Sequence, residues 1–374
     1  MKTEQLRWSP INGWEKRGTP VGERCSLVTV FYDHPTCRTS EWFDELRDLY
    51  PDALIVGASS SGSIAGTLIN DESAEITAVR LECSHVKMAV EEIGSYINGV
   101  ELGKVLGGKL EAEGLKHVFV LSDGLSVNGS DLAEGLVQSI PDGVVIAGGL
   151  AGDGARFEST SIIANAPAKS GIVALIGFYG ETLQAKTGCF AGWEEFGAER
   201  IITRSVGNVL YEIDGKPALE LYKSYLGEFA SGLPGSGLRF PMSVRKNTDT
   251  VPVIRTILAV DEETQSMTFA GDMPAGNLCR LMKTNMDLLI ENAGMAARAS
   301  HQDHEESFLV LMVSCVGRRL VLGQLCEEEL EIIRETLGEQ AVMSGFYSYG
   351  ELSPSGVSAC SLHNQTMTLV SIYE

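Results

Sequence analysis

The chain has 374 residues, of which 44% are hydrophobic and 21% charged, and its formal net charge is −21 at pH 7. Because a strongly acidic chain repels phosphate backbones and anionic lipid, these values argue against nucleic-acid binding and against a membrane-surface protein. The length is typical of two globular domains, and the longest apolar runs are too short to span a bilayer, so we expect no membrane insertion.

Short apolar runs that end at glycine or turn residues predict the strands of the first half. They lie at 27–32, 53–57, 117–124 and 143–149. Amphipathic stretches at 102–110 and 131–139 predict helices between them. Strand patterns with short links follow from 160 to 204, which indicates antiparallel pairing.

The segment 210–227 is the natural division of the chain. A strand there ends at Asp214-Gly215, and Pro217 follows at a position that the first turn of a helix tolerates. We therefore predict domains of residues 22–215 and 216–368. The second half continues with a hairpin, helices and buried strands. The whole predicts an α+β fold, with mixed α/β layers, largely antiparallel sheets and outer helices.

A weak internal repeat links the two halves. ALIVGASSSGSI (53–64) and AVMSGFYSYGEL (341–352) share a buried strand followed by glycine, serine and glycine at the same spacing. A third copy at 144–154 keeps only the strand and its glycines. The repeat suggests a pseudo-symmetric pair of domains.

Glycine after a buried strand lets backbone N–H groups approach a ligand, and serine adds hydroxyl groups. Ser60 and Gly62 are therefore candidate ligand-binding residues, although a tight turn with capping serines fits the same pattern. No lysine follows the second glycine, so this is not a phosphate loop, and no GxSxG motif indicates a serine hydrolase.

Charged candidates are few. Asp123, Asp153 and Glu351 follow buried strands, where aspartate is most often turn chemistry. Arg318, beside a glycine, has the chemistry to grip a ligand carboxylate, with a surface ion pair as the alternative. His363 could bind a ligand, coordinate a haem iron, or be satisfied within its own loop. The eight cysteines form no CxxC pair, which fits reduced thiols in the cytoplasm.

Six motifs in sequence resemble the FIST (F-box and intracellular signal transduction) family over nearly the whole chain. They are LSDGLSVNG (121–129), GGLAGDG (148–154), YEIDGKPALELYKSYLG (211–227), VSCVGRR (313–319), SGFYSYGELSP (344–354) and HNQTMTL (363–369). The resemblance adds Cys315, Tyr349 and Asn364 to the candidate ligand-binding residues.

The resemblance implies a bacterial signal-transduction sensor that binds a small ligand and is not an enzyme. Some stand-alone members are haem proteins that sense nitric oxide and act on histidine kinases, in two-component systems, or on cyclic-di-GMP enzymes. We accordingly expect such a partner, with His363 as the candidate haem and metal ligand. The alternatives are an amino-acid sensor without haem, a hydrolase that uses Ser60 or Cys315, and a scaffold without a ligand.

Overall fold

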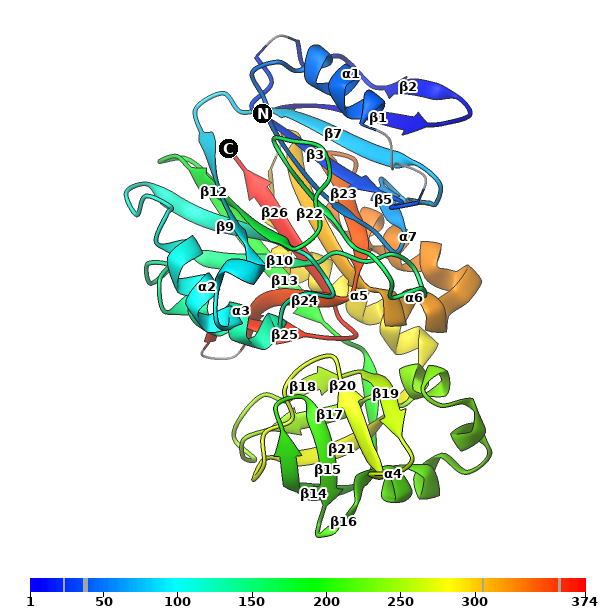
Figure 1. The fold of residues 1–374 in the computed structure, drawn as a ribbon. Coiled ribbons are helices and arrows are strands. Elements are labelled where there is room, and N and C mark those ends of the chain that lie inside the picture. Colours follow the sequence, from blue (N-terminus) through cyan, green and yellow to red (C-terminus); the bar gives the residue numbers. More distant parts are fainter. Residues whose placement is uncertain (23, 36–39, 305, 356–357) are drawn as a thin grey trace.

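The computed structural model describes residues 1–22, 24–35, 40–304, 306–355 and 358–374. Within these residues the chain forms three six-stranded sheets and one eight-stranded sheet (Figure 1). The three six-stranded sheets make a larger body, and the fourth sheet makes a smaller body from residues 193–284. Parallel and antiparallel strands occur together, so the predicted α+β fold of two layered domains is confirmed.

Each sheet of the larger body is built around one parallel pair of strands joined by helix. The first sheet pairs β3 (Leu27–Tyr32) with β4 (Leu54–Ser59) around α1 (Glu41–Leu49). Antiparallel strands flank this pair on both sides. The remaining strands of the sheet are β11 (Ile162–Ala164), β7 (Ala74–Arg80), β1 (Lys2–Ser9) and β2 (Gly13–Arg17).

The second sheet repeats this plan with β9 (Leu115–Ser122) and β10 (Val145–Leu150) as the parallel pair. The helix between them is α3 (Gly129–Val137), and α2 (Gly99–Gly107) packs beside it. The other strands are β12 (Ile172–Tyr179), β24 (Gly350–Ser355), β25 (Ser358–His363) and β8 (His85–Glu92).

The third sheet has β22 (Phe308–Cys315) and β23 (Ala341–Ser348) as its parallel pair. Between them lie α6 (Val316–Leu322) and α7 (Cys326–Leu337), while α5 (Met286–Ser300) packs on this sheet. The other strands are β26 (Met367–Tyr373), β5 (Ser63–Ala65), β6 (Leu68–Asn70) and β13 (Gln184–Phe190).

Each of the three parallel pairs has a glycine at the equivalent position of its second strand. A Cβ atom built on Gly57, Gly148 or Gly345 would lie 2.1, 2.0 or 2.2 Å from a carbonyl oxygen of the neighbouring strand. That separation is far below any real contact, so each pair can approach this closely only with glycine at this position.

The turns after β4, β10 and β23 are joined by a closed ring of backbone hydrogen bonds, in which each turn donates to one neighbour and accepts from the other. The bonds are Ser61 N to Tyr347 O (2.8 Å), Gly152 N to Ser59 O (3.0 Å) and Tyr349 N to Leu150 O (3.1 Å). Each unit also lends an edge strand to another unit's sheet. The expected pair of symmetric domains is therefore corrected to three units within one body.

The largest apolar core lies where the three sheets face one another. Each sheet contributes one phenylalanine to this core that is at most 2% exposed: Phe31, Phe119 and Phe346. The rings of Phe31 and Phe346 stack with their centroids 4.8 Å apart. This core fixes the three turns of the hydrogen-bonded ring relative to one another.

The smaller body is a strongly bent sheet with one covering helix, α4 (Ala218–Leu226). Its strands are β14 (Trp193–Val206), β15 (Val209–Ile213), β16 (Lys216–Pro217), β17 (Met242–Arg245), β18 (Val253–Arg255), β19 (Ile257–Asp261), β20 (Ser266–Phe269) and β21 (Leu278–Thr284). The predicted division at 215/216 lies in the turn between β15 and β16, which pair with each other. The chain thus passes from one sequence half to the other inside this sheet.

Candidate ligand-binding cleft

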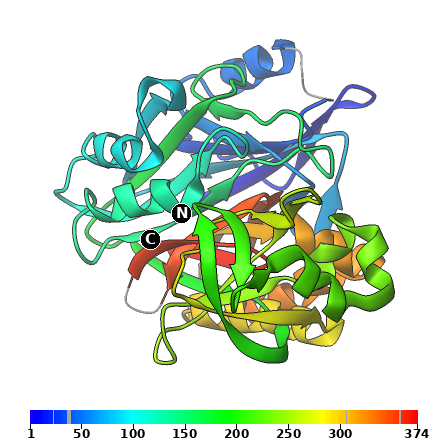
Figure 2. The same ribbon diagram turned by 60° about the horizontal axis from the view of Figure 1, so that its bottom comes forward.

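A cleft lies between the two bodies, where the chain leaves the carboxyl ends of β9, β10, β22 and β23. Two adjoining cavities, of about 380 and 480 Å³, fill it. They share the lining residues Leu125, Phe157, Leu258, Ala270 and Tyr349. Figures 1 and 2 show the smaller body against the end of the larger one that carries α6. Both volumes are typical of small-molecule sites, which in α/β sheets lie beyond the carboxyl ends of strands.

The wall of the larger cavity is mostly apolar, whereas Ser126, Asn128 and Asn208 add polar side chains to the smaller one. Among the described residues that line the two cavities, none is Asp, Glu, Lys, Arg or His. Four large apolar side chains of the larger cavity are more than two-fifths exposed: Leu125, Phe157, Leu258 and Leu320. Thr256 lines the larger cavity, and its hydroxyl is buried without a hydrogen-bond partner among the described residues. The larger cavity therefore suits a neutral, largely apolar molecule, and the smaller cavity offers it hydrogen-bonding side chains.

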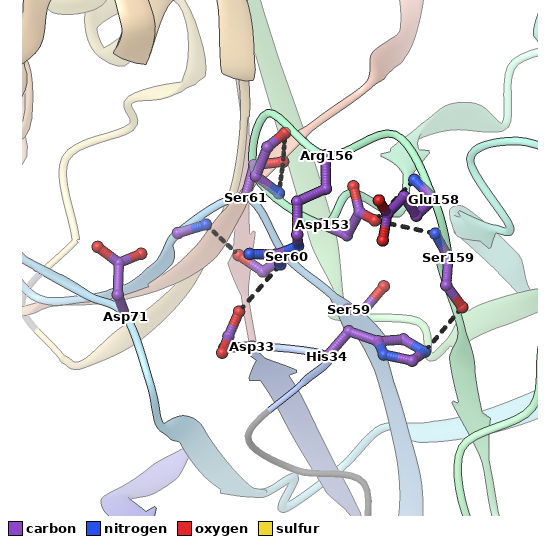
Figure 3. A network of polar contacts seen from close by, with 12 residues as sticks. Asp33, His34, Ser59, Ser60, Ser61, Asp71, Asp153, Arg156, Glu158 and Ser159 are labelled. Atoms are coloured by element: carbon purple, nitrogen blue, oxygen red, sulfur yellow. Dashed lines mark hydrogen bonds and ion pairs between the residues drawn. The ribbon is translucent and has the colours of Figure 1, made fainter.

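Phe157 is held over the cleft in a strained backbone conformation. Its φ is +55°, a left-handed value that bulky residues rarely adopt. The Asp153 carboxylate accepts the amide N–H groups of Phe157, Glu158 and Ser159, each at 2.9 Å. Figure 3 shows Asp153 beside Glu158 and Ser159. Since three donors converge on one carboxylate, the loop retains the strained conformation.

Tyr349 completes this aromatic wall. Its hydroxyl donates to Asp153 Oδ1 and lies 3.1 Å from the carbonyl oxygen of Gly154. Its ring stacks on Phe157, with 4.4 Å between centroids and 14° between planes. Burial acts to raise the pKa of Asp153, but the hydrogen bonds from Tyr349 and the three amides outweigh it, so that this pKa is lowered.

Asp153→Asn is expected to lower the free energy of unfolding by about 2 kcal/mol near pH 7, because an amide replaces a charged acceptor of several N–H groups. A lowered folded pKa gives stability that is present above the ordinary value of 3.8 and lost as the pH falls through the folded value. The difference from wild type should therefore shrink below about pH 4 in urea unfolding. Glu158→Gln, which changes an exposed side chain on the same loop, is the matched control; an equal loss there would contradict the role of Asp153.

Family comparisons agree with this architecture. The FIST N domain model matches residues 26–216, and the FIST C domain model matches residues 218–354. The chain belongs to the FIST family. FIST domains are associated with small-ligand sensing in signal transduction. A comparison with curated proteins gave no match. In the described part of this FIST protein, no helix is long and apolar enough to cross a membrane.

The two FIST domain matches meet within the smaller body, so the cleft combines residues of both. Phe157 and Leu125 come from the FIST N match, while Leu258, Ala270 and Tyr349 come from the FIST C match. The FIST sequence domains and the three-dimensional bodies therefore divide the chain at different places, and the cleft depends on both sequence domains.

Asp123 shapes a second loop that lines the cleft of this FIST protein. Its carboxylate accepts the amides of Leu125 (2.9 Å), Ser126 (3.0 Å) and Gly171 (2.8 Å). It is 1% exposed and lines neither cavity. Asp123 and Asp153 thus have equivalent parts, since each holds the backbone of a loop whose apolar side chain contributes to the cleft.

The first glycine loop lies beside the cleft and not in it. Ser60 Oγ accepts the amide of Gly62 at 2.8 Å, and both residues are buried. A Cβ atom on Gly62 would lie 2.6 Å from Arg319 Nη1, so this glycine makes room for that guanidinium. Figure 3 shows Ser60 and Ser61 packed against the loop of Asp153. Ser60 and Gly62 line neither cavity.

Cys315 lines the larger cavity, whereas Arg318 does not reach it. Burial raises the pKa of the Cys315 thiol well above its ordinary value, which keeps the thiol protonated. Arg318 is fully buried and pairs with Glu329, with 2.9 Å between Nη2 and Oε2. Arg318 therefore binds a carboxylate of the protein itself, since its Nε and Nη2 atoms both donate to Glu329 Oε2.

Glu351, Asn364 and His363 form a buried polar region that lines neither cleft cavity. Burial raises the pKa of Glu351 to about 7, against hydrogen bonds from Ser348 and Thr366 that lower it. The side-chain amide of Asn364 is fully buried without a partner among the described residues. These residues are close to one another in space but separate from the cleft.

The surroundings of His363 bear on its expected role as a haem ligand. Burial first, and the charge of Arg255 second, lower its pKa to about 4, so the imidazole is neutral, as a metal ligand must be. However, its Nε2 atom lies 3.3 Å from the Ser353 carbonyl oxygen, and only 8% of the residue is exposed. Among the described residues, no group of three His, Cys, Asp or Glu side chains could hold a metal ion. As placed, His363 offers no open face for haem.

Sequence reasoning missed most of the cleft lining. Phe157 could have been found as the single aromatic residue in the polar run GDGARFES that follows the Asp153 turn. Thr256, Leu258 and Ala270 carry no such signal, because they lie on or beside short strands of the smaller body. Only the three-dimensional packing of the two bodies brings them opposite Phe157 and Tyr349.

Proposed function

We propose that this FIST protein is a sensor that binds a neutral small molecule, mostly apolar, in the cleft between its two bodies. The observation that carries the proposal is the lining itself, with four exposed apolar side chains and no charged one among the described residues. Exposed apolar surface of this kind is typical of a binding site. The Thr256 hydroxyl supplies the one unpaired polar contact.

The signal is proposed to be a change in how the two bodies sit against each other. A ligand that touches Phe157 and Tyr349 on one wall and Leu258 on the other favours the arrangement in which both walls contact it. The protein then acts without turnover, through a partner. From the family resemblance, the partner we propose is a histidine kinase or a cyclic-di-GMP enzyme in bacterial intracellular signalling.

The proposal is tested with two matched dyes. N-phenylnaphthylamine is neutral, whereas anilinonaphthalene sulfonate has nearly the same ring system with a negative charge. We expect saturable fluorescence enhancement with the neutral dye and at least about tenfold weaker binding of the anionic one, because none of the described lining residues is a cation. Equal binding of both dyes would contradict an uncharged site.

Ala270→Trp should abolish binding of the neutral dye, because Ala270 lines both cavities and an indole would fill the cleft. Ala198→Trp is the control, since Ala198 lies in the same small body but is exposed and lines neither cavity. Both variants should show wild-type circular dichroism. Retained binding in Ala270→Trp would place the dye elsewhere.

Haem-dependent nitric-oxide sensing at His363 remains an alternative proposal. The neutral imidazole favours it, and the contact of Nε2 with Ser353 disfavours it. A Soret band in the purified protein, lost in His363→Ala, would support it.

An amino-acid ligand would need a cation in the cleft, and Arg318 is already paired with Glu329. A hydrolase that used Cys315 would need a lowered thiol pKa to form the thiolate, whereas burial raises the pKa of this thiol.

A further inference from the structure

Arg255 is a buried cation that, among the described residues, donates only to backbone carbonyl groups. It lies at the end of β18 in the smaller body and is 6% exposed. Its guanidinium donates from Nε to Asp272 O (3.2 Å), and from Nη1 to Ile254 O (3.2 Å) and Leu362 O (2.9 Å). All three acceptors are backbone carbonyl oxygens. Among the described residues, no carboxylate oxygen lies within 4.0 Å of the guanidinium, and none accepts from Nη2.

Burial of a guanidinium without a carboxylate partner is unfavourable. Arg255 differs in this respect from the other buried arginine of the described residues, Arg318. Arg318 is fully buried and pairs with Glu329 at 2.9 Å. At Arg255, burial lowers the pKa to about 10, against the charge of Asp272, which raises it. A buried cation whose guanidinium touches no carboxylate among the described residues has the chemistry to receive an anion from outside.

A cavity adjoins this guanidinium. It has a volume of about 370 Å³ and lies between α3, β18 and β25. Arg255 lines it together with Ser130, whose hydroxyl is buried and has no partner among the described residues. Ser361 and Glu134 also line it, and Glu134 is exposed at the rim. This cavity shares no lining residue with the two cavities of the cleft.

We propose that this cavity is a second ligand site, in which a small oxyanion, a carboxylate or a phosphate, binds between the Arg255 guanidinium and the Ser130 hydroxyl. A guanidinium is the side chain best suited to planar oxyanions, and a hydroxyl donates one more hydrogen bond. The exposed carboxylate of Glu134 opposes anion binding and so limits the site to small anions of low charge.

A bound anion would also tie the two bodies together. Arg255 belongs to the smaller body and already donates to Leu362 O in the larger one, while Ser130 is on α3 of the larger body. An oxyanion held by both side chains adds a bridge at the same junction. The site does not depend on the ligand proposed for the cleft, since it has separate residues and the opposite preference for charge.

The test is a titration of the full chain with sodium acetate and, separately, sodium phosphate, with sodium chloride at matched ionic strength as the control. The melting temperature should rise saturably with at least one oxyanion and not with chloride. A response to acetate alone identifies a carboxylate site, and a response to phosphate identifies a phosphate site. The same melting temperatures in all three salts would overturn the proposal.

Three variants locate the response. Arg255→Met should weaken oxyanion binding by about tenfold or more, and Ser130→Ala by less. Glu134→Gln should tighten it by about threefold, because a like charge at the rim is removed. If Arg255→Met fails to fold, the other two variants still show whether the anion binds in this cavity. Unchanged binding in both Ser130→Ala and Glu134→Gln would place the anion elsewhere and refute the site.

Discussion

Arg318→Met is expected to lower the free energy of unfolding by about 3–5 kcal/mol, because it leaves the Glu329 carboxylate buried and unpaired. Both side chains of the pair are fully buried. Glu329 Oε1 also accepts the Tyr347 hydroxyl at 2.7 Å, so the pair lies within a larger polar network. Unfolding curves of the variant and wild type in guanidinium chloride measure this difference in the free energy of unfolding.

The neighbouring residue supplies the control. Arg319 pairs with Asp71 at 2.7 Å, but these side chains are 23% and 60% exposed. Arg319→Met should therefore cost about 1 kcal/mol or less. The double variant Arg318→Met/Glu329→Gln should recover part of the loss, since it removes the orphaned charge. Equal costs for Arg318→Met and Arg319→Met would contradict the assignment of Arg318 as a structural residue.

Arg318 also stabilises the passage between the two bodies. Its guanidinium donates to the carbonyl oxygens of Ala191 and Leu289. Ala191 precedes the first strand of the smaller body, and Leu289 lies in the first turn of the helix that follows its last strand. One buried side chain therefore holds both connections at fixed positions. Arg318→Met should loosen the cleft as well as the core, which binding of the neutral dye would register.

Glu351→Gln is expected to flatten the pH dependence of stability by on the order of 3 kcal/mol. Burial raises the folded pKa from 4.5 to about 7, so the folded state binds this proton more tightly than the unfolded chain. The contribution is complete below about pH 4.5 and is lost as the pH rises through about 7. Wild type should therefore lose more stability than the variant between about pH 5 and about pH 8.

Urea unfolding at both pH values measures this difference. Burial also raises the pKa of Glu75 to about 7, but Glu75 is present in both proteins and cancels in the comparison. Glu335→Gln, at an exposed position of α7, should leave the pH dependence unchanged. A Glu351→Gln variant with the wild-type pH dependence would show that Glu351 is ionised in the folded protein throughout this range.

Buried strands were the most predictable part of the fold. The run 27–32 coincides with β3, and 117–124 overlaps β9, because each is a continuous apolar run that ends at polar or turn residues. The hairpin β1–β2 was missed, and only the second half of the long strand β14 lay within the predicted strand pattern. These strands are half-exposed and rich in charged residues, so they carry no apolar run.

The candidate site was much less predictable. Asp123, Asp153 and Tyr349 were found through motifs, because the turns they stabilise leave a sequence pattern. The residues of the opposite wall were not found, since Thr256 and Leu258 reach the cleft only through packing of the two bodies. The internal repeat was clear in two copies and weaker in the third. The unit of β10 keeps its glycine but has Ala151 where the other two have serine.

A crystal structure of the protein soaked with N-phenylnaphthylamine tests the central claim most directly. The account predicts the dye between the ring pair of Phe157 and Tyr349 and the facing side chains of Leu258 and Ala270. Its amine should lie within hydrogen-bond reach of the Thr256 hydroxyl. Dye bound away from these residues, with the cleft empty, would contradict the account.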